Sequence, residues 1–216
     1  MRRRRRTARR APIAPRRERV APARRDQEPR VAERHVSGKG GGGGRHTVRL
    51  PVVRKPAVLV FRTAEPAHVT LPRHAPGKRE RGYTLTGGER PVEARVPLAR
   101  AGDHQVVRFQ LTFRDRAQVA WEARTELVDL VPGFDAYTEG RGFDVVRYLG
   151  EPGPGVLRHR GRGAFLLQAL DWDLKEWVKL AEGNGDGDVE LRWPGPGFYQ
   201  VRAHGTWTLT QIVPEQ

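Results

Sequence analysis

Short runs in which apolar and polar residues alternate begin near Thr47 and continue almost to the C-terminus. In the segment HQVVRFQLTF, residues 104–113, the side chains of Val107, Phe109 and Leu111 would share one face of an extended chain. Turn-forming segments such as TGGER interrupt the runs roughly every 8–12 positions, a spacing typical of antiparallel sandwiches and barrels. The pattern predicts an all-β fold built as an antiparallel, jelly-roll-like β-sandwich.

The runs fall into two groups on either side of residues 127–144, a glycine-rich stretch with little periodicity. That stretch is either a linker between two modules or a long surface loop inside one. Taken as a linker, it divides the chain into a first β-sandwich module at 47–126 and a second at 145–216. Residues 1–46 then form an N-terminal segment of different composition.

The segment DWDLKEWVKLAEG, residues 171–183, allows two interpretations. Leu174, Trp177, Val178 and Ala181 follow the spacing of one face of a helix. The flanking runs are strongly β-like, and the segment therefore favours a strand, a turn and a second strand.

The two groups also match each other in pattern. Residues 91–125 and 188–212 each contain a strand, a glycine-bearing turn, a long strand and a last strand that carries a tryptophan, Trp121 or Trp207. A pattern that recurs in this way predicts two copies of one supersecondary unit. Trp121 and Trp207 would point inward.

The N-terminal segment carries most of the net charge. Residues 1–46 hold sixteen Lys and Arg against four acids, a net charge of +12, whereas the other 170 residues hold 24 against 21. Their apolar content is too low to offset the entropy lost on ordering, which predicts a disordered tail. The glycine run 40–44 would act as a flexible linker, because it lacks the order of a phosphate-binding loop.

An extended arginine-rich segment neutralises phosphates or other anions without reading a sequence. The candidate polyanion-binding residues are Arg2, Arg3, Arg4, Arg5, Arg6, Arg9, Arg10, Arg16 and Arg17. The partners this predicts are nucleic acid or an anionic polymer. The same composition is also typical of codon bias.

Glycines and aromatics in the second group carry a resemblance to a known family. The stretches GPGVLRHRGRGAFLLQALD and GPGFYQVRAHGTWTLTQI resemble small β-sandwich repeat modules of actinobacterial-type envelope and secreted proteins. The matching positions are Gly153, Pro154, Val156, Gly161, Gly163, Phe165, Gly205, Trp207 and Leu209, within residues 145–213. The resemblance implies a sandwich fold and a non-catalytic role.

Composition excludes several classes of site and bears on localisation. The chain has no cysteine, which excludes disulfides, thiolate metal sites and a cysteine nucleophile. No run approaches the roughly 18 apolar residues of a membrane-spanning helix, and no apolar stretch follows the N-terminal arginines as a signal peptide requires. The sequence as written favours the cytoplasm. A different translation start would favour the envelope or secretion.

The NGDGD segment offers a weak candidate metal site. Asn184, Asp186 and Asp188 place oxygen ligands at alternate positions, as in calcium loops. Val189 and Gly195 occupy positions where such a loop needs Gly and Glu, and N-G and D-G are typical of hairpin turns. A turn is the favoured interpretation, and no cofactor is expected.

Three tryptophans outside the most regular strands form a possible ligand platform. Trp172, Trp177 and Trp193 would present exposed aromatic faces, which stack on sugars or bases. Carbohydrate or protein is therefore a possible partner of the sandwich.

Evidence for catalysis is slight. Ser37 is the only serine, it lies in the expected tail, and no G-x-S-x-G motif is present. Asp171 and Glu176 could pair as in glycosidases, and His159 and His204 stand at expected strand ends without metal-binding spacing. The sequence thus favours a non-enzymatic binding or structural protein held to a polyanion by its tail. The alternatives are a nucleic-acid-associated structural protein and, more remotely, a small carbohydrate-binding module or hydrolase.

Overall fold

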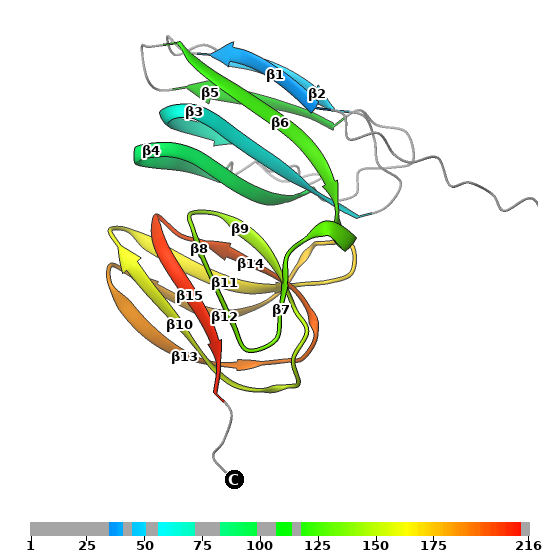
Figure 1. Cartoon of the computed structure of the whole chain (residues 1–216), viewed down its shortest axis with the longest axis vertical. Coiled ribbons are helices and arrows are strands. Elements are labelled where there is room, and N and C mark those ends of the chain that lie inside the picture. Colours follow the sequence, from blue (N-terminus) through cyan, green and yellow to red (C-terminus); the bar gives the residue numbers. More distant parts are fainter. Residues whose placement is uncertain are drawn as a thin grey trace, which may run out of the picture. The chain divides into compact units, whose positions relative to one another are not determined.

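The structure is a computed structural model that describes residues 35–40, 45–50, 56–71, 83–98, 107–113 and 118–212. Most of these residues lie in β-strands, and none lies in an α-helix (Figure 1). Every pair of neighbouring strands is antiparallel except β7 with β9. The predicted all-β, antiparallel class is therefore confirmed. No helix among the described residues has the length and apolar character needed to cross a membrane.

Six strands form the first sheet. They are β1 (His35–Gly40), β2 (Arg45–Leu50), β3 (Ala57–Leu71), β4 (Tyr83–Leu98), β5 (Val107–Phe113) and β6 (Val119–Leu127). Their order is β1-β6-β3-β5-β2, and β4 pairs with β3.

The long strands β3 and β4 each change neighbours along their length. The first half of β3 lies between β6 and the second half of β4, whereas its second half lies between β5 and the first half of β4. The register shifts around Pro66, where a proline cannot donate to the ladder. The TGGER segment, expected as a turn between strands, lies inside β4.

The remaining strands form two further sheets. A short 3-10 helix, η1 (Val128–Leu130), leads into β7 (Gly133–Phe134), β8 (Tyr137–Arg141), β9 (Asp144–Tyr148), β10 (Gly153–Gly161), β11 (Ala164–Leu170), β12 (Glu176–Asn184), β13 (Gly187–Trp193), β14 (Gly197–Arg202) and β15 (Gly205–Gln211). One sheet has the order β13-β10-β15-β8 and the other β12-β11-β14-β9-β7. Segment 171–183 is thus a turn and a strand, as favoured, and not a helix.

Alternation divides the side chains of these sheets between separate apolar clusters. In β9, Val146 packs in the core between the two later sheets and Val145 packs in a cluster with Val58 and Val60 of β3. The opposite face of β3, with Leu59 and Phe61, belongs to a third cluster. The first half of β3 is therefore buried on both faces, which explains its continuous apolar run AVLVF.

Large aromatic rings lie over cross-strand glycines. Trp121 stands opposite Gly38 in the register of β6 and β1, and Trp207 stands opposite Gly140 in that of β15 and β8. Both tryptophans are buried, as predicted. A methyl group at Gly38 would lie 2.8 Å from Cζ2 of Trp121, which is closer than two carbon atoms can approach.

Two of the predicted boundaries were wrong. Strand β1 and the start of β2 lie inside residues 1–46, because β1 pairs with β6 and β2 with β5. Residues 127–144 include β7 and β8, and β8 pairs with β15 along its whole length. Neither segment is a simple tail or linker. Residues 1–34 and 41–44 lie outside the described residues.

Candidate binding surfaces

Two of the three predicted platform tryptophans are exposed. Trp172 lies in the turn between β11 and β12 with 77% of its surface accessible, and Trp177 lies at the start of β12 with 68% accessible. The register of β12 against β11 pairs Val178 with Ala169 and Glu176 with Leu170, so that Trp177 has no partner residue between them. This irregularity leaves Trp177 beside the turn, on a strand that closes one edge of its sheet.

The expectation that Trp193 is exposed was wrong, because this side chain is fully buried. Its ring stacks on Tyr148 at 4.6 Å between centroids and meets Tyr199 edge-on at 5.0 Å. Gly155 makes room for it, since a methyl group there would lie 2.2 Å from the indole nitrogen. Trp193 is thus a core residue of the two later sheets.

The NGDGD segment forms a turn, as favoured, but the turn is not a hairpin. Residues Gly185 and Asp186 connect β12 of one sheet to β13 of the other, and Gly185 takes a φ of 75° that glycine tolerates. Asp186 accepts a hydrogen bond from the backbone N–H of Gly161 at 2.7 Å. Its carboxylate therefore ties this turn to the one between β10 and β11.

Asp188, the other candidate carboxylate, lies between two arginines. It accepts hydrogen bonds from Arg158 at 2.9 Å and from Arg160 at 2.7 Å, and these bonds hold its pKa below the ordinary value. No group of three or more potential metal-ligating side chains occurs among the described residues. The carboxylates of Asp186 and Asp188 thus serve a turn and two ion pairs.

The carboxylates considered for a glycosidase also have structural partners. Asp171 Oδ1 accepts the backbone N–H groups of Asp173, at 2.9 Å, and Lys175, at 2.8 Å, which shapes the turn before β12. Glu176 pairs with Arg202 of β14. Both groups are therefore engaged in holding local structure.

The histidines occupy unlike environments. His159 is fully buried in β10, where Nδ1 donates to the carbonyl oxygen of Gly185 at 2.7 Å and the ring lies 4.7 Å from that of Phe165. It is an interior residue of its strand and not a strand end. His204 is exposed after β14, and partial burial together with the charge of His159 lowers its pKa.

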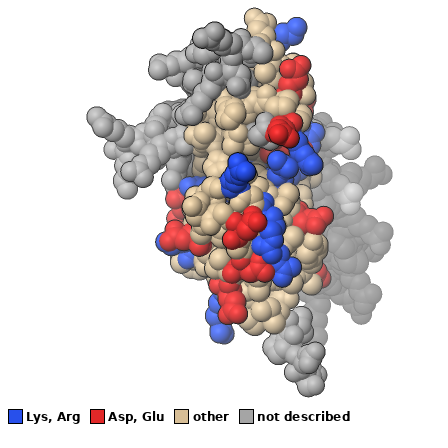
Figure 2. Space-filling view, turned by 90° about the vertical axis from the view of Figure 1, so that its left-hand side faces the viewer, with Lys and Arg blue, Asp and Glu red and all other residues tan. Residues whose placement is uncertain are grey.

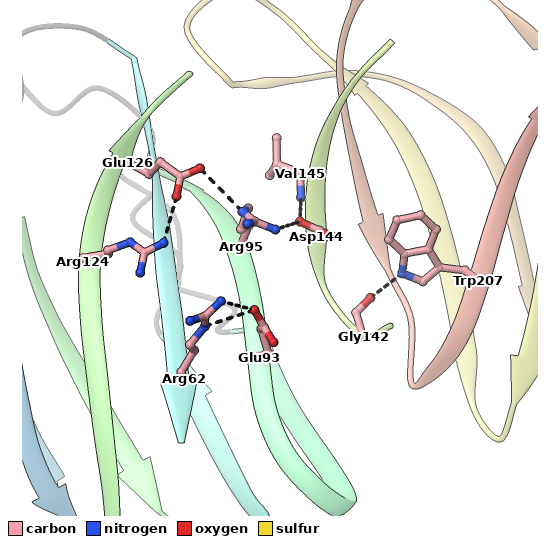
Figure 3. A network of polar contacts seen from close by, with 9 residues as sticks. All are labelled: Arg62, Glu93, Arg95, Arg124, Glu126, Gly142, Asp144, Val145 and Trp207. Carbon is pink, nitrogen blue, oxygen red and sulfur yellow. Dashed lines mark hydrogen bonds and ion pairs between the residues drawn. The ribbon is translucent and has the colours of Figure 1, made fainter. Parts of the chain in front are cut away.

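A polar network that the sequence did not suggest connects the first sheet with β9 (Figure 3). Arg95 of β4 lies between Glu126 of β6, 3.7 Å from Nε, and Asp144 of β9, 3.4 Å from Nη1. Arg124 also pairs with Glu126, at 3.3 Å. The backbone N–H of Arg95 donates to the carbonyl oxygen of Phe143 at 3.0 Å, which fixes β4 against the turn before β9.

Asp144 is the most perturbed carboxyl group of this network. Burial raises its pKa to about 6, although the positive charge of Arg95 and a 2.8 Å hydrogen bond from the N–H of Val145 act in the opposite direction. Desolvation outweighs pairing here because a single guanidinium at 3.4 Å compensates only part of the lost hydration. No sequence signal marked Asp144, since an acid at the start of a strand is common.

Two further predictions concern residues 1–46. The nine candidate polyanion-binding arginines, between Arg2 and Arg17, lie outside the described residues. Ser37, expected in the tail, lies in β1 opposite Glu122 and has an exposed side chain.

The sequence matches no known protein-family model, and no curated protein matches it. The resemblance to envelope-type sandwich modules therefore stays a prediction. Several of its positions have a physical role in this fold. Phe165, Trp207 and Leu209 are buried, and a methyl group at Gly205 would lie 2.1 Å from the carbonyl oxygen of Arg160.

Proposed function

We propose that this chain is a non-enzymatic binding or structural protein that attaches to a polyanion through its arginine-rich N-terminus. The observation that carries the proposal is the segregation of charge along the chain. Residues 1–34, which precede β1, contain fourteen arginines and four acids, whereas residues 47–216 carry a net charge of only +3. A segment of this composition attracts phosphates and other anions over a long range.

The charged side chains of the β-sheets support this division because many of them neutralise each other. Arg62 pairs with Glu93, Lys179 with Glu182, and Arg202 with Glu176. Figure 2 shows acidic and basic side chains intermingled over one face of the molecule. Such a surface has little net attraction for a polyanion, and the N-terminal arginines are left as the principal source of positive potential.

We also infer that the body consists of two copies of one β unit. The first and second halves of β3 correspond to β10 and β11, and the first and second halves of β4 correspond to β12 and β13. The remaining equivalents have the same order along the chain: β1 and β8, β2 and β9, β5 and β14, β6 and β15. Each strand of one unit pairs with the same partners, by this correspondence, as its counterpart does in the other unit. Each unit also contains one cross-strand pair of a glycine and a tryptophan. The jelly-roll topology stays a prediction.

The attachment is tested by replacing Arg2, Arg3, Arg4, Arg5 and Arg6 with glutamine in the full chain. Binding to random-sequence duplex DNA, to single-stranded RNA and to polyphosphate is then measured by fluorescence anisotropy at two salt concentrations. A protein that makes six to ten phosphate contacts loses roughly 10³–10⁵-fold in affinity between 50 and 200 mM salt. Removal of five arginines should weaken binding at low salt and reduce this loss of affinity with salt. Unchanged affinity in the glutamine variant would overturn the proposal.

A charge-preserving control uses lysine at the same five positions. Because the attraction depends on charge, the lysine variant should retain most of the binding and its salt dependence. The panel of polyanions also separates the alternatives. Equal binding to polyphosphate and nucleic acids favours a general tether, whereas a strong preference for DNA or RNA favours the nucleic-acid-associated protein.

A second candidate function is carbohydrate binding at Trp172 and Trp177. Their exposed rings are the observation that favours it, since aromatic faces of this size are costly to leave in water and stack well on sugars. A glycan array with the full chain, repeated with Trp172→Ala and Trp177→Ala, tests it. Signals that disappear in both variants would support the platform, and silence across the array would remove carbohydrate as a ligand.

A further inference from the structure

A pocket of about 490 Å³ lies beside the middle of β4, next to the turn between β8 and β9. Leu85 and Thr86 come from the first half of β4, and residues 90–95 come from its second half. Gly140 to Asp144 line the opposite side. The volume falls within the usual range for small-molecule sites, and the pocket joins segments far apart in sequence.

The pocket combines an apolar lining with a surplus of guanidinium groups. Leu85, Val92, Ala94 and Phe143 supply buried apolar side chains. The charged lining residues are Arg62, Arg90, Arg95 and Arg141 together with Glu93 and Asp144, which leaves two positive charges uncompensated when both acids are ionised.

The surplus can be assigned to two residues. Arg62 donates to Glu93 through Nε at 3.0 Å, and Arg95 pairs with Asp144 (Figure 3). Arg90 and Arg141 are exposed and make no hydrogen bond or ion pair with any described residue. Arg90 lies in β4 and Arg141 lies in β8, so that two different strands each contribute one of these arginines to the pocket.

The paired arginines keep unused hydrogen-bonding capacity as well. A guanidinium carries five N–H donors. In Arg95, Nε is buried and makes no hydrogen bond to a described group, since its nearest acid oxygen, on Glu126, is 3.7 Å away. A buried donor in this state is costly, and an additional acceptor near it would be favourable.

We propose that this pocket binds a small organic anion. Arg90 and Arg141 hold its carboxylate or phosphate group, and the apolar body of the ligand packs against Leu85, Val92 and Phe143. Arginine suits this role because its planar donors match both kinds of oxyanion. The site is separate from the N-terminal arginines, and it does not rest on the function proposed above.

Isothermal titration of the full chain with four probes tests the proposal. The probes are benzoate, phenyl phosphate, inorganic phosphate and benzyl alcohol. If both parts of the pocket contribute, benzoate or phenyl phosphate binds saturably, whereas inorganic phosphate and the neutral alcohol bind at least tenfold more weakly. The comparison of benzoate with phenyl phosphate identifies the preferred head group. Absence of saturable binding by either aromatic anion overturns the proposal.

A pair of charge-matched variants localises the binding. Arg90→Gln with Arg141→Gln removes the two pocket arginines that pair with no described residue, and Arg162→Gln with Arg192→Gln removes two exposed arginines that do not line the pocket. The pocket variant should lose at least tenfold in affinity for the better anion, and the control should keep it. Equal weakening in both variants shows general electrostatic attraction and refutes the assigned site.

A chemical measurement on the unaltered chain gives the same information without a variant. Phenylglyoxal modifies accessible arginines, and mass spectrometry identifies the modified positions. A saturating anion should protect Arg90 and Arg141 but leave Arg162 and Arg192 reactive. Uniform protection, or none, would contradict the proposal even if the variants failed to fold.

Discussion

Gly140 stands directly opposite Trp207 in the antiparallel pair of β8 and β15, and the indole ring fills the space where a side chain would be. A methyl group at Gly140 would lie 2.2 Å from Cζ2 of the ring. The indole nitrogen donates to the carbonyl oxygen of Gly142 at 3.2 Å, which holds the ring in place. The glycine is therefore required by contact and not by backbone conformation.

Gly140→Ala should destabilise the fold. The ring of Trp207 is fully buried and cannot move aside without displacing its neighbours, so that overpacking costs roughly 2–3 kcal/mol of unfolding free energy. Urea denaturation followed by tryptophan fluorescence measures the change.

Gly197→Ala in β14 is the matched control. The nearest atom to a methyl group there is Cε2 of Tyr199 at an ordinary 3.8 Å. Its stability should stay within about 0.5 kcal/mol of the unsubstituted chain. Similar losses at Gly140 and Gly197 would mean that strand propensity, and not the contact with Trp207, sets the cost.

Arg95→Ala should be more harmful than the loss of an exposed arginine. The substitution leaves the carboxylate of Asp144 without its only paired cation among the described residues, in a largely desolvated position. Breaking this partly buried ion pair should cost about 2 kcal/mol, between the values typical of exposed and of buried pairs. Thermal and chemical denaturation of the full chain provide the measurement.

Arg158→Ala serves as its control. After Arg158→Ala, Asp188 still pairs with Arg160, just as Glu126 still pairs with Arg124 after Arg95→Ala. The ion pair of Arg158 with Asp188 is about half exposed, and its loss should cost much less than the loss of Arg95. A smaller effect at Arg95 than at Arg158 would show that the network of Figure 3 contributes little to stability.

The raised pKa of Asp144 predicts a particular dependence of stability on pH. Its folded-state pKa of about 6 exceeds the ordinary value of 3.8, so that between these values the folded chain binds more protons than the unfolded one. Stability from this group is therefore fully present below pH 4 and decreases as pH rises through 6, by at most about 3 kcal/mol. Asp144→Asn, which cannot ionise, should lose this decrease.

The measurement compares the unfolding free energies of both chains at several pH values from 4 to 7. The variant should gain stability relative to the unsubstituted chain as pH rises over this range. Parallel curves would show that Asp144 titrates alike in the folded and unfolded chains.

The exposure of Trp172 and Trp177 predicts a distinct fluorescence component. Trp121, Trp193 and Trp207 are buried, so that a neutral quencher such as acrylamide should reach mainly the two exposed rings. Replacing both exposed tryptophans with phenylalanine should remove the red-shifted, readily quenched emission. Persistence of that component in the double variant would mean that one of the other three rings is accessible.

Much of the fold follows from alternation alone. The strong runs of the second half all became strands, and Trp121 and Trp207 point inward because their neighbours along the strand alternate with polar residues. The strand assignment of Glu176–Asn184 also followed from its flanks. These are local properties, and the sequence expresses them directly.

The errors concern features that depend on partners distant in sequence. The segment HVSGKG has too few apolar residues to indicate a strand, but Gly38 accommodates the ring of Trp121 when β1 pairs with β6. Trp193 stands beside Pro194 at a strand end and gives no local sign of its aromatic cluster. The register that brings Arg95 to Asp144 joins residues 49 positions apart. No periodicity encodes such pairings.

The continuity of β3 has a consequence for how the chain tolerates interruption. Its counterparts in the proposed second unit, β10 and β11, are separate strands joined by an exposed turn at Arg162, so a peptide inserted there would extend a connection and leave both strands whole. An insertion at Glu65, which is also exposed, would instead cut a single strand that serves β6, β4 and β5 at once. Of these two accessible sites, only the later one should accept a graft.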